Sequence, residues 1–291
     1  LAWSRHRARR DRAIERDKLR GERVALERDA RLELDRLGPQ LHRGFVLRTE
    51  LLEKDNLAMA LTIAGYYLGL AIVLSGVASG PGSGMLSEDL IDLVVFGLVA
   101  IVLLNLSGWI NDKIILSKFD NQKEIVQDRN IGMGAIEGGN HVAVGLITAG
   151  ALSGEGGLLS GAVFWVLGQA GLIVAGLLYN KMTSFDLHEQ IENNNVAVGV
   201  AFAGVLIGFG NIIRLAGEGD FVSWTQSLSE FGYYAVVGLL LLPLVRIFAD
   251  KVLLPGARLT DELVRDVPNV GVGAIEATSY LAASILIGLT L

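Results

Sequence analysis

The chain has no cysteine, only 5 prolines, and few charged residues for its length of 291 residues. The lack of cysteine excludes disulfides, thiolate metal ligands and Cys nucleophiles, and it leaves no cysteine pattern from which to infer a redox compartment. Charged residues make up 19% of the chain, against roughly 25% in an average soluble protein. Hydrophobic residues make up 51%, and the mean hydropathy is +0.46. This balance argues against an ordinary soluble enzyme.

The charge is concentrated at the N-terminus. Residues 1–56 hold 15 of the 25 Lys and Arg residues but only 11 of the 31 acidic ones, so this region is basic and the remainder acidic. We predict a charged helical head over residues 1–48. It is interpreted either as a solvated helix near an anionic membrane surface or as a helix that binds a cytoplasmic partner through residues 1–40. Interleaved acids, and Trp3 as the only aromatic residue before Phe45, argue against nucleic acid as a partner.

Long apolar runs follow the head, and each is long enough to cross a bilayer core, which needs about 20 residues. The sequence therefore predicts an all-α, polytopic transmembrane helix bundle. The seven predicted spans are 57–78, 88–110, 130–152, 158–179, 195–215, 231–249 and 269–291.

Basic residues alternate between the connections that join these spans. The connections with Lys or Arg are 111–129, 180–194 and 250–268, and those without are 79–87, 153–157 and 216–230. By the positive-inside rule, the N-terminus is predicted to be cytoplasmic and residue 291 to lie on the far side of the membrane. The chain begins with Leu instead of Met, which favours an earlier span before residue 1.

Four of the predicted helices open with the same pattern, which starts at an Asn. The four segments are NLAMALTIAG (56–65), NIGMGAIEGG (130–139), NVAVGVAFAG (195–204) and NVGVGAIEAT (269–278). Asn is a favoured N-cap, so Asn56, Asn130, Asn195 and Asn269 are predicted to cap these helices.

The spacing of these Asn residues indicates a tandem duplication. The step along the chain from the first Asn to the third equals the step from the second to the fourth, and we call this step the repeat offset. The first predicted membrane repeat covers residues 49–184 with four spans, and the second covers 185–291 with three, its eighth helix missing. A second subunit is one way to complete the bundle. All repeats run parallel, which argues against an inverted-repeat transporter.

The 36 glycines lie within the apolar runs, and small residues recur at matched positions after each Asn. Small residues allow transmembrane helices to approach closely. We therefore expect the four Asn-led helices to form an inner ring, with the other spans outside. A permeation path lined by bare backbone is the alternative interpretation. The predicted packing residues are Gly65, Gly69, Gly139, Gly204 and Gly208.

The stretch SFDLHEQIENNNVAVGVAFAGVLIGFGNIIRLAG, residues 184–217, resembles the family called domain of unknown function 350. Residues 119–130 carry a second copy of its opening, and residues 260–269 carry a third in which Phe is missing and Pro268 precedes the Asn. The resemblance covers roughly residues 49–291. It implies an integral protein of the bacterial cytoplasmic membrane, and it carries no established activity.

Two acids, Glu137 and Glu276, lie seven residues after an Asn, about 10 Å inside a predicted span. A charge at this depth costs at least about 2.5 kcal/mol, so each acid should be protonated or paired. His141 and Tyr280 follow four residues later on the same helix faces. Because the acids mark alternate repeats, we expect them to face each other across the bundle. Three roles stay open for these residues at this point: a proton or cation path, hydrogen bonds that fix the register of the helices, and the binding of a ligand.

Motifs of familiar enzymes and nucleotide-binding proteins are missing: the sequence contains no GxSxG, P-loop or HExxH motif. We therefore expect no enzyme activity, no cofactor and no metal site. The leading hypothesis is an ion or proton permeation component that uses the paired intramembrane Glu residues. The alternative is a scaffold that anchors a cytoplasmic or membrane partner. Expected partners are the lipid bilayer and a second subunit, either another copy or a different membrane protein.

Overall fold

The computed structural model describes residues 46–78, 85–114, 120–153, 156–218 and 221–290. Within these ranges every regular element is a helix, as predicted. The proposed partner segment 1–40, and all but the last three residues of the predicted head, lie outside the described residues.

The chain divides into two compact units, Leu1–Asp55 and Asn56–Leu291. The described part of the first unit contains the single-turn π-helix η1, Thr49–Glu53, in which Glu50 is paired with Lys54 at 2.6 Å. All the long helices belong to the second unit.

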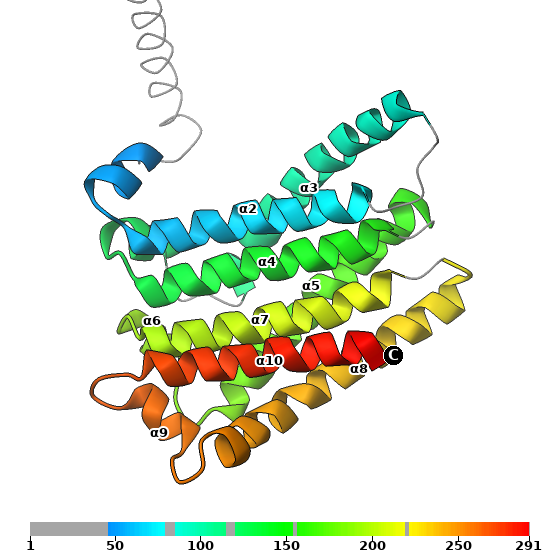
Figure 1. The fold of residues 1–291 in the computed structure, drawn as a ribbon. Helices are drawn as coiled ribbons and strands as arrows, with labels where there is room; N and C mark the ends of the chain where they lie inside the picture. The colour runs from blue at the N-terminus through cyan, green and yellow to red at the C-terminus, as the bar shows by residue number, and fades with distance from the viewer. Residues whose placement is uncertain (1–45, 79–84, 115–119, 154–155, 219–220, 291) are drawn as a thin grey trace, which may run out of the picture. The chain divides into compact units, whose positions relative to one another are not determined.

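Four long helices of the second unit lie side by side in one layer, which we call the row. They are α2 (Leu57–Ala78), α4 (Ile131–Ser153), α7 (Val196–Gly217) and α10 (Val270–Thr290), in that order, and all run in the same direction (Figure 1). Each begins directly after one of the four Asn residues. The expected inner ring was wrong in its geometry: the four helices form a row in which only α4 and α7 have row neighbours on both sides.

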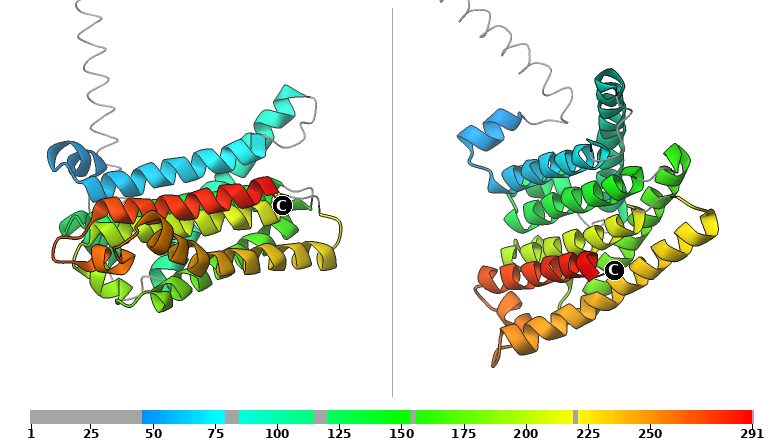
Figure 2. Two further views of the ribbon diagram at one scale, coloured as in Figure 1. Left: turned by 60° about the horizontal axis from the view of Figure 1, so that its bottom comes forward. Right: turned by 45° about the vertical axis from the view of Figure 1, so that its right-hand side comes forward.

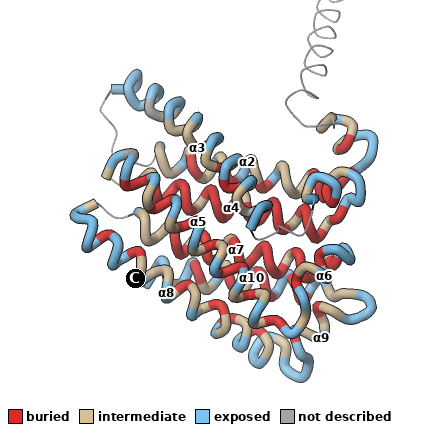
Figure 3. Tube along the Cα trace, turned by 180° about the vertical axis from the view of Figure 1, so that it is seen from behind, coloured by how far each residue is buried: buried red, intermediate tan, exposed pale blue. Residues whose placement is uncertain are grey.

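The helices with larger side chains form a second layer on one side of the row. This layer contains α3 (Leu86–Ile114), α5 (Gly157–Met182) and α8 (Trp224–Phe248), and each packs against the row helix before it and the row helix after it (Figure 3). Short helices lie in the connections at the end where the row helices begin (Figure 2). They are η2 (Lys123–Gln127), α6 (Leu187–Glu192), η3 (Ala249–Leu253) and α9 (Leu259–Val264).

Glycine is required where the row helices meet, because their backbones are in direct contact. A methyl group added at Gly65 of α2 would overlap the backbone of Gly138 on α4, and one added at Gly139 would lie 2.7 Å from Cβ of Ala203 on α7. Contacts of this kind allow close van der Waals packing where lipid removes the hydrophobic driving force. The five predicted packing residues Gly65, Gly69, Gly139, Gly204 and Gly208 all lie at contacts between row helices.

Five of the helices are long and apolar enough to cross a membrane by length and composition: α2, α3, α5, α7 and α10. The other two long helices, α4 and α8, are not among these five, although they contain 23 and 25 residues. Within them α4 carries Glu137, Asn140 and His141, and α8 carries Glu230 and Arg246.

Candidate functional site

Glu137 is buried on the second turn of α4, with a residue exposure of 5%. Its Oε1 accepts a hydrogen bond of 2.8 Å from Nδ2 of Asn121, which lies just before η2. A neutral amide from the connection therefore faces this carboxyl group. Sequence reasoning passed over Asn121, because an Asn in a polar connection carries no distinguishing pattern.

Glu276 is completely buried on α10, at the equivalent repeat position. Its Oε1 lies 2.5 Å from Nη1 of Arg246 on α8 and also accepts a hydrogen bond of 3.4 Å from the hydroxyl of Tyr179 on α5. The guanidinium donates to Oγ1 of Thr260 at 2.9 Å through Nη2, and its carbon lies 5.5 Å from the centre of the Tyr179 ring. A charged residue within a membrane helix needs such a partner, because lipid gives it no solvation.

Arg246 is the residue of this site that sequence reasoning missed. It lies three residues before the end of the predicted span 231–249, where a basic residue fits the positive-inside pattern and indicates only orientation. In the structure it lies inside α8, and its side chain is 11% exposed and directed at Glu276. The available signal was its position within an apolar run, one turn before the predicted end of the helix.

The two acids do not face each other, which corrects the expectation from the repeat pattern. Glu137 is on α4 and Glu276 is on α10, and α7 lies between these helices in the row (Figure 1). The repeat pattern fixes the height and helix face of each acid, but it does not determine whether alternate helices face each other or lie in one layer.

The two predicted relay groups, His141 and Tyr280, contact different neighbours. The His141 ring lies edge-on to the ring of Tyr66 on α2, with centroids 5.4 Å apart, and its buried Nδ1 has no hydrogen-bond partner among the described residues. The hydroxyl of Tyr280 donates to the carbonyl of Leu242 on α8 at 3.1 Å. The four predicted path residues Glu137, His141, Glu276 and Tyr280 therefore form two separate groups.

The four Asn residues before the row helices have a double role. Their Oδ1 atoms accept from the backbone N–H three residues later, at 2.9 to 3.3 Å, in Asn56, Asn130, Asn195 and Asn269. The Nδ2 atoms of the first three also donate to a carbonyl that precedes the next row helix, and the acceptors are Ile125, Ile191 and Leu263 in turn. Each of these three caps therefore connects its helix to the connection before the next row helix. Asn269 instead donates to Glu262 in its own connection.

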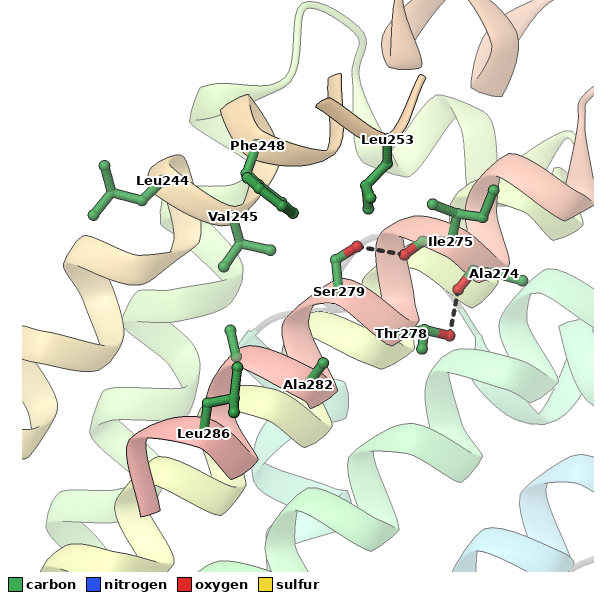
Figure 4. Close-up of a pocket in the computed structure, with 11 residues that line it drawn as sticks. Leu244, Val245, Phe248, Leu253, Ala274, Ile275, Thr278, Ser279, Ala282 and Leu286 are labelled. Carbon is green, nitrogen blue, oxygen red and sulfur yellow. Dashed lines mark hydrogen bonds between the residues drawn. The ribbon is translucent and has the colours of Figure 1, made fainter. Parts of the chain in front are cut away.

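Two cavities border the Arg246–Glu276 region. One, of about 400 Å³, lies at the end where the row helices begin, and it is lined by Arg246 together with Asp250, Arg258, Thr260 and Asp261. The other is an apolar groove of about 960 Å³ between α8 and α10 (Figure 4). The hydroxyls of Thr278 and Ser279 in that groove donate to carbonyls of their own helix, so its lining is effectively apolar.

Metal binding finds no support in the described part of the chain, which contains no group of three or more His, Cys, Asp or Glu side chains able to hold an ion. Glu137 and Glu276 each have a side-chain partner from another element.

Parallel glycine-contact helices, apolar outer helices and buried, paired acids together define a multi-pass helical membrane protein. The sequence model described as Domain of Unknown Function (DUF350) matches this chain twice, over residues 41–152 and 155–291, and the chain belongs to that family. The second match groups α5, α7, α8 and α10, so its boundary differs from the division predicted after residue 184.

Relatives carry names of the same kind. A "UPF0719 transmembrane protein" of Aquifex aeolicus (strain VF5) is 24% identical over 245 residues, which cover 82% of this chain and 88% of the relative. The "UPF0719 inner membrane protein YjfL" of Escherichia coli (strain K12) is 28% identical over 128 residues, which cover 44% of this chain and 89% of the relative. No solved structure matches the chain. The protein is thus a multi-pass membrane protein of an uncharacterised family.

Proposed function

We propose that all seven long helices cross the cytoplasmic membrane in two parallel repeats, with the N-terminal side in the cytoplasm. The parallel direction of the row and the alternation of basic residues between connections support this topology. Although α4 is less apolar, it lies between α2 and α7, so its neighbours shield its polar residues from lipid.

Within this topology, we propose that the protein is a non-enzymatic scaffold of the membrane. The observation that carries the proposal is that the buried acids of the row helices are paired with side chains of neighbouring elements. Glu276 is completely buried in an ion pair with Arg246, Glu137 accepts from Asn121, and backbone contacts fill the space between the row helices. Groups arranged in this way stabilise one packing of the helices, which suits a structural role.

Flux through reconstituted liposomes tests the scaffold proposal. We expect the purified wild-type protein to give no more proton or cation flux than liposomes that contain Glu137→Gln with Glu276→Gln, at equal protein density. Flux that is well above this control in the wild type would overturn the scaffold proposal in favour of permeation. Circular dichroism and gel filtration of both proteins ensure that only folded material is compared.

A permeation role is the second candidate, and one observation favours it. The cavity of about 400 Å³ includes Arg246 in its lining, so the ion pair with Glu276 borders a space at the predicted cytoplasmic end. A proton path at this site would use Glu276 and not Glu137. In the flux assay it would show as loss of conduction in Glu276→Gln and its retention in Glu137→Gln.

A cytoplasmic partner at residues 1–40 stays part of the scaffold proposal. Photo-crosslinking in intact cells from a residue in 41–48, which both chains keep, compares the full chain with one that lacks residues 1–40. Loss of a discrete crosslinked product on deletion is the expected result, and an unchanged set of products would contradict a partner at this site.

A further inference from the structure

Arg214 is an exception to the distribution of basic residues along the chain. After residue 57, every other Lys and Arg belongs to a predicted cytoplasmic connection or to the helix end beside it. Arg214 instead lies three residues before the end of α7 at Gly217, on the predicted outer side of the membrane. A basic residue at this end opposes the positive-inside pattern, so it needs a reason other than orientation.

The packing of the row does not require this arginine. The repeat offset relates Arg214 of α7 to Ser75 of α2. The two helices make equivalent glycine contacts, through Gly65 with α4 and through Gly204 with α10. One half of the row is therefore built without a cation at this position.

A cavity of about 840 Å³ lies beside Arg214. The described residues that line it belong to α2, α4 and α7 or follow α7 directly, and none of them belongs to α3, α5 or α8. The cavity therefore opens on the face of the row that is turned away from the second layer, which is the near face in Figure 1.

The lining of this cavity is polar at the predicted membrane surface and apolar farther in. Arg214 and Glu218 lie at the outer end of α7, and Trp224, a residue type typical of the membrane–water interface, begins α8 on the same side. Leu68 and Leu146 lie ten and seven residues before the ends of α2 and α4, about 15 and 10 Å inside at the helical rise. A phospholipid has the same order of polarity, with its headgroup at the surface and its acyl chains directed inward.

The polar end of the cavity presents charges of both signs. Nη1 of Arg214 is paired with Oε1 of Glu218, and Nε of Arg214 donates to Oδ1 of Asn211 at 3.1 Å. Asn211 in turn donates to Oγ of Ser284 on α10 at 3.2 Å, so a second row helix helps to position the arginine. The side chains of Arg214 and Glu218 are 27% and 40% exposed, and a guanidinium with five N–H donors keeps bonding capacity beyond these two contacts.

We propose that this cavity binds one phospholipid of the outer leaflet with a phosphoethanolamine headgroup, its phosphate on Arg214 and its ammonium on Glu218. A guanidinium binds phosphate oxygens through paired N–H donors, and a carboxylate accepts hydrogen bonds from a primary ammonium. The acyl chains then cover the apolar part of the cavity around Leu68 and Leu146. The leaflet rests on the proposed topology, whereas binding to the isolated protein does not, so the two proposals fail separately.

The charges of the cavity favour this headgroup over the other common ones. An anionic headgroup such as phosphoglycerol would supply no cation to Glu218. A quaternary ammonium, as in phosphocholine, has no N–H donor and is recognised by aromatic rings, and none of the described residues that line the cavity is aromatic. A soluble headgroup without chains would leave the apolar part of the cavity uncovered.

Native mass spectrometry of the purified, delipidated full-length protein tests the proposal. The protein is titrated with phosphatidylethanolamine, phosphatidylcholine or phosphatidylglycerol that carry the same acyl chains. We expect one phosphatidylethanolamine to bind with about tenfold higher affinity than either of the others, the effect of a hydrogen bond to a charged group. Equal affinities for the three lipids would overturn the proposal. Glycerophosphoethanolamine that bound as tightly as the lipid would also overturn it, in favour of a soluble ligand.

Variants at the two charges define the site. Arg214→Gln should lower the affinity for phosphatidylethanolamine about tenfold, and Glu218→Gln should remove the preference over phosphatidylglycerol. Arg265→Gln is the matched control, because Arg265 also forms an exposed ion pair, with Glu262 at 3.0 Å, but lies on the predicted cytoplasmic side. It should leave the affinity unchanged, and equal losses for Arg214→Gln and Arg265→Gln would overturn the proposal.

A second measurement uses the wild-type protein, so it does not depend on whether a variant folds. Vesicles that contain the protein and phosphatidylethanolamine with a photoreactive group in one acyl chain are irradiated, and the labelled peptides are identified. We expect label within residues 68–76 of α2 and 146–153 of α4. Label confined to α8 and α10, which form the groove of Figure 4, would place the lipid elsewhere and overturn the assignment.

Discussion

Glu137 and Glu276 occupy the same position in two repeats, yet the protein satisfies them differently. Glu137 accepts a hydrogen bond from the neutral amide of Asn121, whereas Glu276 forms an ion pair with Arg246 and accepts from Tyr179. Both carboxyl groups are buried in row helices that make equivalent glycine contacts. The backbone arrangement is shared by the two halves, whereas the described partners of the acid differ.

The position equivalent to Arg246 shows where the divergence occurred. The segments NDKIIL (111–116) and ADKVLL (249–254) align the second-layer helices α3 and α8, and this alignment places Gly108 of α3 at the position of Arg246. The first half thus has no side chain where the second half has a guanidinium. Each acid depends on its own partner, so substitutions at the two sites should differ in size, and those at the shared glycine contacts should not.

The largest effect is expected for Arg246→Met, which leaves Glu276 buried without its cation. Breaking a buried ion pair by removing one partner costs about 3–5 kcal/mol of unfolding free energy. Denaturant titration in detergent micelles measures this loss. Adding Glu276→Gln to Arg246→Met should recover part of it. Gly108→Ala at the equivalent position should cost much less, because the added methyl meets only the His141 ring, at 3.7 Å. Similar losses for Arg246→Met and Gly108→Ala would remove the contrast between the two halves.

Gly65→Ala and Gly204→Ala should each destabilise the row by about 1–3 kcal/mol, because the added methyl overlaps the neighbouring backbone. Equal losses at the two positions are expected, since the α2·α4 and α7·α10 contacts are equivalent. Gly232→Ala on α8 is the matched control. An added methyl there meets nothing within 4 Å, and the change should stabilise the helix by up to about 1 kcal/mol. A clear difference between Gly65 and Gly204 would show that the duplication did not preserve packing.

Asn121→Ala removes the amide that faces Glu137, and we expect a loss of about 1–2 kcal/mol, the cost of leaving a buried acceptor without its donor. The loss should be smaller than for Arg246→Met, because no charged partner is removed. Thermal unfolding followed by circular dichroism compares the two variants. If Asn121→Ala were as damaging as Arg246→Met, the two acids would be equivalent after all.

The smallest difference is expected between Asn130→Ala and Asn269→Ala. Each change removes a helix cap, which costs about 0.5–2 kcal/mol. Asn130 also donates to Ile191 of the following repeat, so its loss should exceed that of Asn269 by about 1 kcal/mol. Equal losses would indicate that the bond between repeats contributes no net stability.

Much of the helical architecture is predictable from the sequence, because helix length and small-residue spacing are local properties. The repeated Asn marks the starts of all four row helices, and Gly65, Gly139 and Gly204 fall at contacts between them. These features depend on periodicity along one helix and on the short reach of a cap.

The arrangement of the row and the partners of the acids were not predictable, because both depend on which helices become neighbours. The small residues of α4 that include Gly139 are compatible with packing in a ring and with packing in a row. Arg246 could not be matched with Glu276, which is 30 residues away and on another helix. Tyr179 is 97 residues from Glu276, and no sequence period connects them.

The sequence by itself determined that this is a helical membrane protein with duplicated, glycine-lined helices and two acids at one repeat position. Apolar length, small-residue spacing and a constant offset between the paired Asn residues carry that information within the chain. Only the tertiary structure decided that these helices form a row, that α7 separates the two acids, and that Arg246 neutralises one of them. Packing in three dimensions chooses neighbours, and the energy of a buried charge depends on the neighbour it meets.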